Sequence, residues 1–347
     1  MLRFRLNLKN AIAVVICIAV TTIFSCCKDD DIYPPIEPTL IASFTYEDEI
    51  DFFSFTSSST GEISDYQWHI SGNQQVMLLS PTEKSTAIEL LSEAATINIS
   101  LTVKNNGGAS TSSQNITLPP LTFSRQYGLG RNTEKECSNN VNYEWYIDQI
   151  NTGQHSYINC GPVCATMAIK WSNQYFSKTP EDARNTYLPE GGWWYTNNIM
   201  DYLTDNGTAH YATSLTQICH LRDQLDNGNI AILCLDMYYV RYQSGKPEWR
   251  KDKFYSTPDK DCGHFIVVKG YKIVDGKVWF EVYDPGSLGA KYDNGTLKGL
   301  DRYYSGEDII QATDVWWKLM IVINNPATPS VRSQAIDHSI IVHQRGR

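Results

Sequence analysis

Asn159-Cys160-Gly161-Pro162 is the stretch that decides the fold of the second half of this chain. A Gly-Pro pair directly after a cysteine suits the first turn of a helix, where proline's fixed φ and missing N–H cost nothing. Apolar residues then recur at helical spacing with polar residues between them, which predicts an amphipathic helix. The apolar set is Val163, Cys164, Met167, Ala168, Trp171 and Tyr175, and the polar set is Thr166, Lys170, Asn173 and Gln174. Cys160 would then lie at the positive end of the helix, where the dipole favours the reactive thiolate.

A base for this thiol is predicted in a hairpin whose strands are residues 264–271 and 278–284. A two-residue turn would place His264 and Asp284 on opposite faces, because side chains alternate along a strand. A three-residue loop that ends in Gly276 would pair Ile273 with Lys277. His264 and Asp284 would then be diagonal neighbours on one face. We therefore predict the three-residue loop.

This register has two further consequences. Lys269 would lie opposite Glu281 on one face of the hairpin. Four apolar residues would gather on the other face beside His264 and Asp284, where the hairpin would pack against the Cys160 helix. They are Ile266, Val268, Phe280 and Val282.

Four short motifs, in this order, resemble the C-39-like branch of papain-fold cysteine peptidases, whose best-known members remove double-glycine leaders from bacteriocin precursors. The motifs are Gln154, Asn159-Cys160-Gly161-Pro162, Gly263-His264 and Asp284-Pro285-Gly286. The resemblance covers about 200 residues, from Ser124 to Asn325. It implies Cys160 as nucleophile, His264 as base and Asp284 as the group that orients the imidazole. It also implies that Gln154 and the backbone N–H of Cys160 bind the oxyanion.

The chain departs from the leader-processing enzymes in one respect. Those enzymes are usually fused to a membrane transporter and its ATPase, whereas this sequence has no second apolar span and no G-x-x-x-x-G-K-[ST] loop. Double-glycine specificity is therefore not expected. The predicted reaction is amide hydrolysis of a peptide or protein through a Cys160 thioester, and it requires neither a cofactor nor a metal.

The N-terminus indicates a lipoprotein. Residues 1–25 contain a basic leading region and an apolar core that is too short to span a membrane as a mature helix. Ile23-Phe24-Ser25-Cys26 resembles a bacterial lipobox, with Cys26 as the lipidated N-terminus, although an ordinary secretory signal is the plainer alternative. The acidic run at 28–31 resembles the export tag of surface lipoproteins. We expect an outer-membrane lipoprotein, surface-exposed or periplasm-facing, with residues 26–39 as a tether.

Net charge argues against two classes of partner. The whole chain carries −9 at pH 7, and removal of residues 1–25 takes away three basic residues and no acidic ones, which leaves −12. Such a chain is not expected to bind nucleic acid or anionic lipid headgroups. The charge indicates neither the peptide substrate nor the oligomeric state.

Residues 40–119 are predicted to form an all-β, immunoglobulin-like sandwich of about seven strands. Alternation is strict over 96–103 and 66–70, and the core would contain Trp68, Phe53 and Phe55. Phe44, Tyr66-x-Trp68 and Leu101-x-Val103-x-Asn105 resemble PKD-type domains of extracellular bacterial proteins. The usual acidic turn after the tryptophan is replaced by Ser71-Gly72-Asn73. A passive spacer is the favoured role for this domain.

Residues 120–325 are predicted to form an α+β papain-like domain, followed by a surface tail at 326–347. Helices are expected after Thr179-Pro180-Glu181, over 196–203 and over 215–226. Strands are expected over 230–239, in the hairpin and over 314–323. Trp193 and Trp194 are candidates for a substrate-groove wall or for core, and His155 for a cleft.

Several alternatives stay open. Cys164 is the competing nucleophile, one turn inside the helix. Cysteines and histidines near 160, 164, 219–220 and 262–264 can also be interpreted as metal ligands, but no pair has a tight structural-zinc spacing. The alternative to an enzyme is an inactive papain-fold module for adhesion or peptide capture. A transacylase would use the same thioester as a hydrolase.

Overall fold

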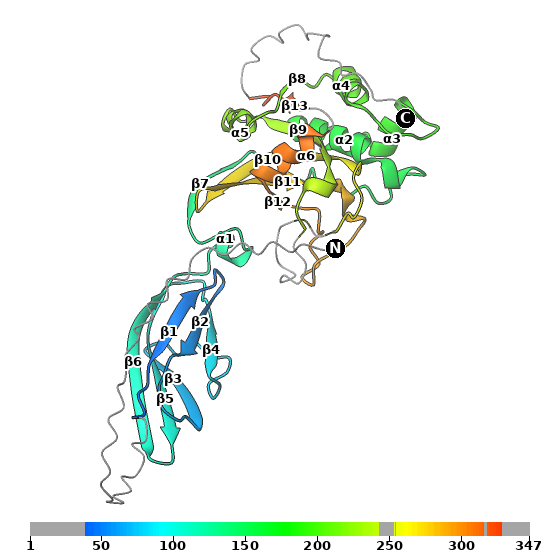
Figure 1. Ribbon diagram of the computed structural model, residues 1–347. Coiled ribbons are helices and arrows are strands. Elements are labelled where there is room, and N and C mark those ends of the chain that lie inside the picture. The colour runs from blue at the N-terminus through cyan, green and yellow to red at the C-terminus, as the bar shows by residue number, and fades with distance from the viewer. Residues whose placement is uncertain (1–38, 243–252, 254, 316–317, 328–347) are drawn as a thin grey trace, which may run out of the picture. The chain divides into compact units, whose positions relative to one another are not determined.

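The computed structural model describes residues 39–242, 253, 255–315 and 318–327 (Figure 1). The predicted signal peptide, Cys26, most of the tether and the tail from residue 328 lie outside the described residues. The described part is rich in β-strands and contains several short helices. None of its helices is long and apolar enough to cross a membrane.

Residues 44–118 form two three-stranded antiparallel sheets (Figure 1). One sheet has the order β1 (Phe44–Asp48), β2 (Phe52–Ser57), β4 (Ser85–Glu89). The other has the order β3 (Asp65–Ser71), β5 (Ala95–Asn105), β6 (Gly108–Leu118). Side chains of β5 alternate between buried and more exposed along most of its length, as the sequence pattern predicts. The structure thus has six strands here instead of about seven.

One apolar core lies between these sheets. Trp68, Phe53 and Phe55 are all buried in it, which confirms the predicted core residues. The ring centroids of Trp68 and Phe44 lie 5.2 Å apart in an edge-to-face arrangement. The indole N–H of Trp68 donates to the carbonyl of Glu83 at 2.9 Å, so this buried donor is satisfied.

A seven-stranded antiparallel sheet organises the second half of the chain. Six strands follow the order β12-β11-β10-β9-β13-β8, and β7 pairs with β10. Their bounds are β7 Thr133–Ser138, β8 His210–Ser214, β9 Ile230–Asp236, β10 Gly263–Val274, β11 Lys277–Tyr283, β12 Arg302–Ser305 and β13 Leu319–Ile323. Every residue of β9 is buried, because this strand lies in the middle of the sheet with helices on both faces.

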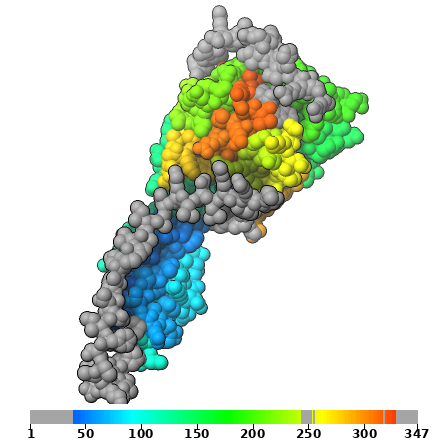
Figure 2. Space-filling view, in the orientation of Figure 1, coloured from blue at the N-terminus to red at the C-terminus, as the bar shows by residue number. Residues whose placement is uncertain are grey.

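Six α-helices and three 3-10 turns complete the described part. The helices are α1 Phe123–Gln126, α2 Cys160–Ser172, α3 Pro180–Thr186, α4 Thr196–Asp205, α5 Ile218–Asp226 and α6 Gly306–Asp314. The 3-10 turns are Ser156–Ile158, Met237–Tyr239 and Pro285–Ser287. Buried residues of α2, α3 and α4 share one core cluster, and those of α5 and α6 share another. The outer side of α6 is seen at the surface in Figure 2 (orange).

The predicted helices at 179–181, 196–203 and 215–226 are confirmed as α3, α4 and α5. Thr179 caps α3 in a reciprocal capping box with Asp182. The predicted strand at 230–239 is shorter, because Met237–Tyr239 is a 3-10 turn. The predicted strand at 314–323 is wrong at its start: Asp314 ends α6, and β13 begins at Leu319.

The nucleophile helix is also different from its prediction. It begins at Cys160 as expected, but it is buried almost all round rather than amphipathic. Thr166, predicted on the polar side, is buried because its hydroxyl donates to the carbonyl of Pro162 at 2.8 Å. Tyr175, predicted on the apolar side, lies beyond the helix end and is 83 % exposed.

The predicted three-residue hairpin loop is wrong. Val274 pairs with Lys277, and the two turn residues Asp275 and Gly276 both have positive φ, of 47° and 75°. Asp-Gly is a preferred pair for such a turn. Backbone N–H groups of Arg131 and Asn132 donate to the Asp275 carboxylate and hold it there.

His264 and Asp284 nevertheless share a face, because the ladder shifts by one residue. Below the turn Gly270 pairs with Glu281, whereas Val268 pairs with Val282, so Lys269 is the extra residue of a β-bulge. The bulge restores the register that the loop was predicted to provide. Lys269 was predicted opposite Glu281, but Gly270 has that place in the ladder; the Lys269 side chain still contacts Glu281, with Nζ 2.6 Å from Oε1.

The packing predicted for the hairpin is wrong as well. Phe265 and Val267 lie in the core cluster of α2, on one side of the sheet. The four residues predicted to pack on that helix instead lie in the cluster of α5 and α6, on the other side; they are Ile266, Val268, Phe280 and Val282. Alternation identified the two faces, but it did not indicate which helices cover each face.

Candidate functional site

Cys160 is the first residue of α2 and is only 5 % exposed. Its sulfur forms a hydrogen bond with the His264 side chain and accepts from the backbone N–H groups of Phe265 and Gly161. α2 packs against β10, so the start of the helix meets the start of the strand. The sulfur therefore lies at a helix start and has three hydrogen-bond partners, one of which is the His264 imidazole.

His264 connects the sulfur to a carboxylate. Its Nε2 lies 2.7 Å from Oδ1 of Asp284, and both residues are buried. With Nε2–H donating to Asp284, Nδ1 is the ring nitrogen left for Cys160. The hydrogen bond of the Asp284 carboxylate to Nε2–H selects this tautomer. Three sequence-predicted residues, Cys160, His264 and Asp284, are thus brought together in one hydrogen-bonded chain.

The pKa values of these three groups move together. Burial opposes the ionised form of each. Despite burial, the charge of Asp284 and the hydrogen bonds to Asp284 and Cys160 raise the pKa of His264 to about 10. The bond to His264 and its charge, with two backbone N–H groups, hold the pKa of Cys160 below its ordinary value of 9.0. His264 and Tyr304 lower the pKa of Asp284 to about 2. The arrangement favours a thiolate beside an imidazolium.

Asp284 is held by more than the histidine. Its Oδ2 accepts from Tyr304 at 2.5 Å and from Tyr255 at 3.4 Å, and its Oδ1 also accepts from the N–H of Gly286 at 2.8 Å. A Cβ at Gly286 would lie 3.0 Å from Cε1 of His264, so glycine leaves room for the imidazole. The carboxylate is therefore fixed on both of its oxygens.

A buried network holds the residue that precedes Cys160. The Asn159 side chain donates to the carbonyl of Thr152 at 2.8 Å and accepts from Nε of Arg184 at 2.9 Å. Asparagine normally caps a helix with this side chain, but here it forms no cap. Asn159 instead ties the start of α2 to the 152 loop and to α3.

The predicted oxyanion donor, Gln154, is exposed and lies in the turn before the 3-10 segment Ser156–Ile158. A second glutamine, Gln149, is 6 % exposed, and its Oε1 has no hydrogen-bond partner among the described residues. The backbone N–H of Gln149 donates to the carbonyl of Pro285 at 2.9 Å, directly after Asp284. Its carbonyl accepts from the hydroxyl of Thr152 at 2.6 Å. Gln149 is therefore linked to both the Asp284 and the Asn159 segments.

The two adjacent tryptophans differ in environment. Trp194 is buried against the start of α2, and a Cβ at Gly161 would lie 2.7 Å from its Cβ. Trp193 is largely exposed. His155 packs against Gly191, whose φ of 97° requires glycine. Trp194 is thus a core residue, and Trp193 is the one available to a groove.

The other cysteines have a different environment from Cys160. Cys164 and Cys234 are buried, and burial raises the pKa of both thiols well above 9.0. The six cysteines of the described part are free; they are Cys137, Cys160, Cys164, Cys219, Cys234 and Cys262. In the same part of the chain, no group of three or more His, Cys, Asp or Glu residues is arranged to hold a metal ion.

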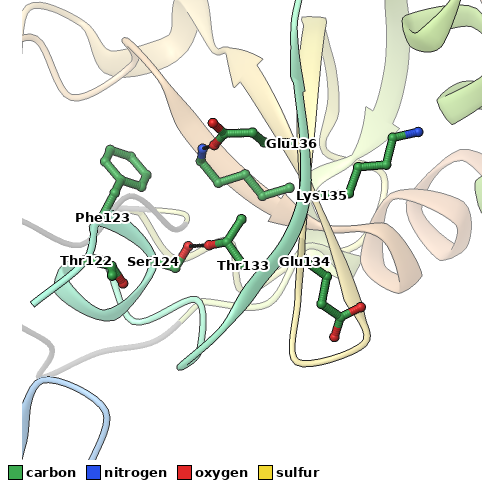
Figure 3. A pocket seen from close by; sticks show the side chains of 8 residues that line it. Thr122, Phe123, Ser124, Thr133, Glu134, Lys135 and Glu136 are labelled. Carbon is green, nitrogen blue, oxygen red and sulfur yellow. Dashed lines mark hydrogen bonds and ion pairs between the residues drawn. The ribbon is translucent and has the colours of Figure 1, made fainter. Parts of the chain in front are cut away.

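A separate depression of about 420 Å³ lies between α1, β7 and β10 (Figure 3). Its lining residues are Thr122, Phe123, Ser124, Thr133, Glu134, Lys135, Glu136 and Lys272. Ser124 and Thr133 share a hydrogen bond of 2.5 Å, and Lys272 forms an ion pair with Glu136. The lining contains no cysteine or histidine, so this depression offers no Cys–His pair.

Three residues of the Cys160 environment were missed by the sequence reasoning: Gln149, Arg184 and Tyr304. Arginine and tyrosine side chains reach the site from α3 and β12, and no local pattern indicates that they do so. Gln149 carried a usable signal, because it also precedes the cysteine, but spacing favoured Gln154.

No protein-family model and no curated protein matches this chain. Among solved structures, the PKD1 domain of the Vibrio cholerae metalloprotease PrtV is 24% identical over 23% of this chain and 96% of that chain, with a TM-score of 0.20. A protein from Bacillus anthracis described as a C-39-like peptidase is 12% identical over 55% of this chain and 98% of that chain, with a TM-score of 0.37. Digestive procathepsin L 3 of Tenebrio molitor larvae is 10% identical over 55% of this chain and 69% of that chain, with a TM-score of 0.35.

Proposed function

We propose that this protein is a cysteine peptidase with a papain-like domain, which hydrolyses peptide bonds through a Cys160 thioester. One observation carries the proposal: the hydrogen-bonded chain from the Cys160 sulfur through His264 to Asp284. A cysteine at a helix start is more often structural than catalytic. Here the thiol has a base within hydrogen-bond reach, and the base is oriented by a third group.

In the first half of the reaction, the Cys160 thiolate attacks the carbonyl carbon of the scissile amide. An S–C bond forms, and the carbonyl π electrons move to oxygen. The His264 imidazolium then gives its Nδ1 proton to the leaving amine as the C–N bond breaks. Asp284 stays ionised and keeps Nε2–H oriented. The products of this half are a free amine and a thioester on Cys160.

In the second half, neutral His264 takes a proton from water as the water oxygen attacks the thioester. The C–S bond breaks and releases the acid, with the thiolate and imidazolium restored. An oxyanion forms in both halves. The backbone N–H of Cys160, at the start of α2, is a suitable donor. Gln154 was predicted as the side-chain donor, and the burial of Gln149 makes it a second candidate.

The test is alkylation with iodoacetamide followed by peptide mapping, at a series of pH values. Cys160 should react fast well below pH 9. In His264→Ala, the pH at which the alkylation rate rises should be higher. Cys164 is the internal control and should react slowly throughout. Equal, slow reaction of Cys160 and Cys164 would contradict the proposal and favour a binding module.

Turnover is tested next on a library of internally quenched peptides. Wild type should cleave at least one of them, and Cys160→Ala none. Addition of an acceptor amine separates hydrolysis from acyl transfer, because a transacylase would join the amine to the acyl fragment. Fast alkylation without any cleavage or transfer would leave a reactive thiol but reject the peptidase.

We also propose that the protein is anchored in the outer membrane through lipid on Cys26, with residues 40–119 as a PKD-like spacer. The lipobox-like sequence supports this proposal. Several acyl chains on one cysteine give firm attachment, at ~0.8 kcal/mol for each buried methylene. Cell fractionation should find wild type in the membrane and Cys26→Ala in the soluble fraction. Membrane association of the variant would reject the lipid anchor.

A further inference from the structure

Arg184, on α3, is a buried cation without a carboxylate partner among the described residues. It is 2 % exposed. Its guanidinium donates from Nε to Oδ1 of Asn159 and from Nη1 to the carbonyl of Gly192, both at 2.9 Å. Contacts of 3.4 Å reach the carbonyls of Leu188 and Ile158. All four acceptors are neutral, so the donors are satisfied while a full positive charge stays in the interior.

A buried charge is costly unless an opposite charge lies nearby. Two of the acceptors, on Ile158 and Asn159, belong to the residues directly before Cys160. The guanidinium carbon also lies 5.8 Å from the ring centre of Trp194, and Trp194 packs on Gly161, directly after Cys160. Arg184 is therefore linked directly to the two residues before Cys160 and, through Trp194, to the residue after it.

Two buried cations, Arg184 and Lys253, lie near the groups of the reactive state. A Cys160 thiolate, a His264 imidazolium and an Asp284 carboxylate sum to one negative charge. The charge of Cys160 acts on Arg184, whereas the charge of Asp284 acts on Lys253. The buried titratable or charged side chains of α2, α3, α4, β9 and β10, besides Cys160, are Cys164, Arg184, Tyr202, Cys234, Asp236, His264, Lys269 and Tyr271, and Asp284 lies just before the 3-10 turn. Cys164, Tyr202 and Cys234 are neutral near pH 7, because burial raises the pKa of each.

We propose that Arg184 is a positioning residue whose charge holds Cys160 as a thiolate. This inference rests on the proposed Cys160–His264 chemistry. Burial lowers the pKa of Arg184, and the charge of Cys160 raises it, which is the effect expected of an opposite charge nearby. Asn159 holds the guanidinium in place next to Cys160, because its Oδ1 accepts from Nε of Arg184. The guanidinium does not touch the substrate in this role.

The test compares two replacements of Arg184 in the full chain. Arg184→Lys keeps the charge and loses the planar fork. Arg184→Gln loses the charge and keeps donors for Asn159 Oδ1 and the nearby carbonyls. The readout is the midpoint of the pH dependence of Cys160 alkylation by iodoacetamide. We expect Arg184→Gln to raise the midpoint by about one pH unit and Arg184→Lys by less than about half a unit.

Arg222→Met is the matched control, because it removes a cation from α5, on the other side of the sheet. Its midpoint should stay at the wild-type value. Equal midpoints for wild type and folded Arg184→Gln would overturn the inference while leaving the peptidase proposal intact. If Arg184→Gln does not fold, the test rests on Arg184→Lys. A midpoint raised by about one pH unit or more in Arg184→Lys would overturn the role of charge, because this variant keeps the charge. Slow, pH-insensitive alkylation of wild-type Cys160 would instead reject the peptidase chemistry itself.

Discussion

Nε2 of His264 donates to Oδ1 of Asp284 at 2.7 Å across two neighbouring strands that are joined by a two-residue turn. A regular ladder from that turn would have put these side chains on opposite faces. The extra residue at Lys269 brings them to the same face. A pairing that determines the proposed chemistry thus depends on an irregularity in the sheet and not on its regular pattern.

The first prediction concerns the pH dependence of turnover. The thiolate–imidazolium pair exists above the pKa of Cys160 and below that of His264, which is raised to about 10. Activity should therefore rise below pH 9, stay level and fall near pH 10. Asp284→Asn removes the charge that raises the pKa of His264, so the alkaline limb should move toward the ordinary histidine value of 6.5. A kcat/KM profile of both proteins measures this, and an unmoved alkaline limb in Asp284→Asn would contradict it.

The second prediction concerns the tyrosine behind the carboxylate. Tyr304→Phe removes the hydroxyl that donates to Oδ2 of Asp284 at 2.5 Å and that also bonds the Arg302 side chain, and it leaves Tyr255 at 3.4 Å. A bond to a buried charge contributes about 1.5–3 kcal/mol, so the free energy of unfolding in urea should fall by that amount. Tyr143→Phe is the control: it removes a bond to the neutral carbonyl of Trp171 and should cost about 1 kcal/mol. Equal losses in the two variants would mean that the charge of Asp284 does not matter.

The third prediction separates the two glutamines. Loss of a side-chain oxyanion donor typically reduces kcat by ~10²–10³-fold. We expect this loss for Gln149→Ala, because Gln149 is buried beside the Asp284 segment, and less than about tenfold for Gln154→Ala. Steady-state kinetics with matched circular dichroism spectra make the comparison. The reverse order would support Gln154, as the sequence spacing predicts.

The fourth prediction concerns the glycine after the nucleophile. Alanine normally stabilises a helix by up to ~1 kcal/mol relative to glycine. Gly161→Ala should instead destabilise the protein by about 1–3 kcal/mol, because its Cβ would lie 2.7 Å from Cβ of Trp194. Gly306→Ala at the start of α6 is the control, since its Cβ meets the mobile end of Ile218 at 3.1 Å and should cost less. Thermal unfolding decides, and a raised Tm in Gly161→Ala would show that Trp194 can move aside.

Local patterns predicted much of the secondary structure. Alternation located β3 and β5, and a Thr-Pro-Glu start located α3. The start of the nucleophile helix also followed from Gly-Pro. The extent of its burial did not, because Thr166 satisfies its hydroxyl within the helix and can then face the core.

Features that depend on distant residues could not be predicted from one sequence. The bulge at Lys269 depends on the packing of a buried ammonium between Glu281 and Asp301. Arg184 and Tyr304 reach the site from α3 and β12 through tertiary contacts alone. The strands β7, β8 and β12 are short and polar in part. Whether such segments form strands depends more on the strands they pair with than on their own residues.

The bulge at Lys269 determines where this hairpin can accept an inserted or deleted residue. Residues added at the Asp275-Gly276 tip would leave the strand pairing unchanged, so His264 would still face Asp284. One residue added or deleted between His264 and Lys269 would move His264 to the other face of the sheet and turn the imidazole away from Asp284. Natural length variation should therefore concentrate at the tip, and a single-codon deletion of Lys269 should abolish activity while most of the sheet still forms.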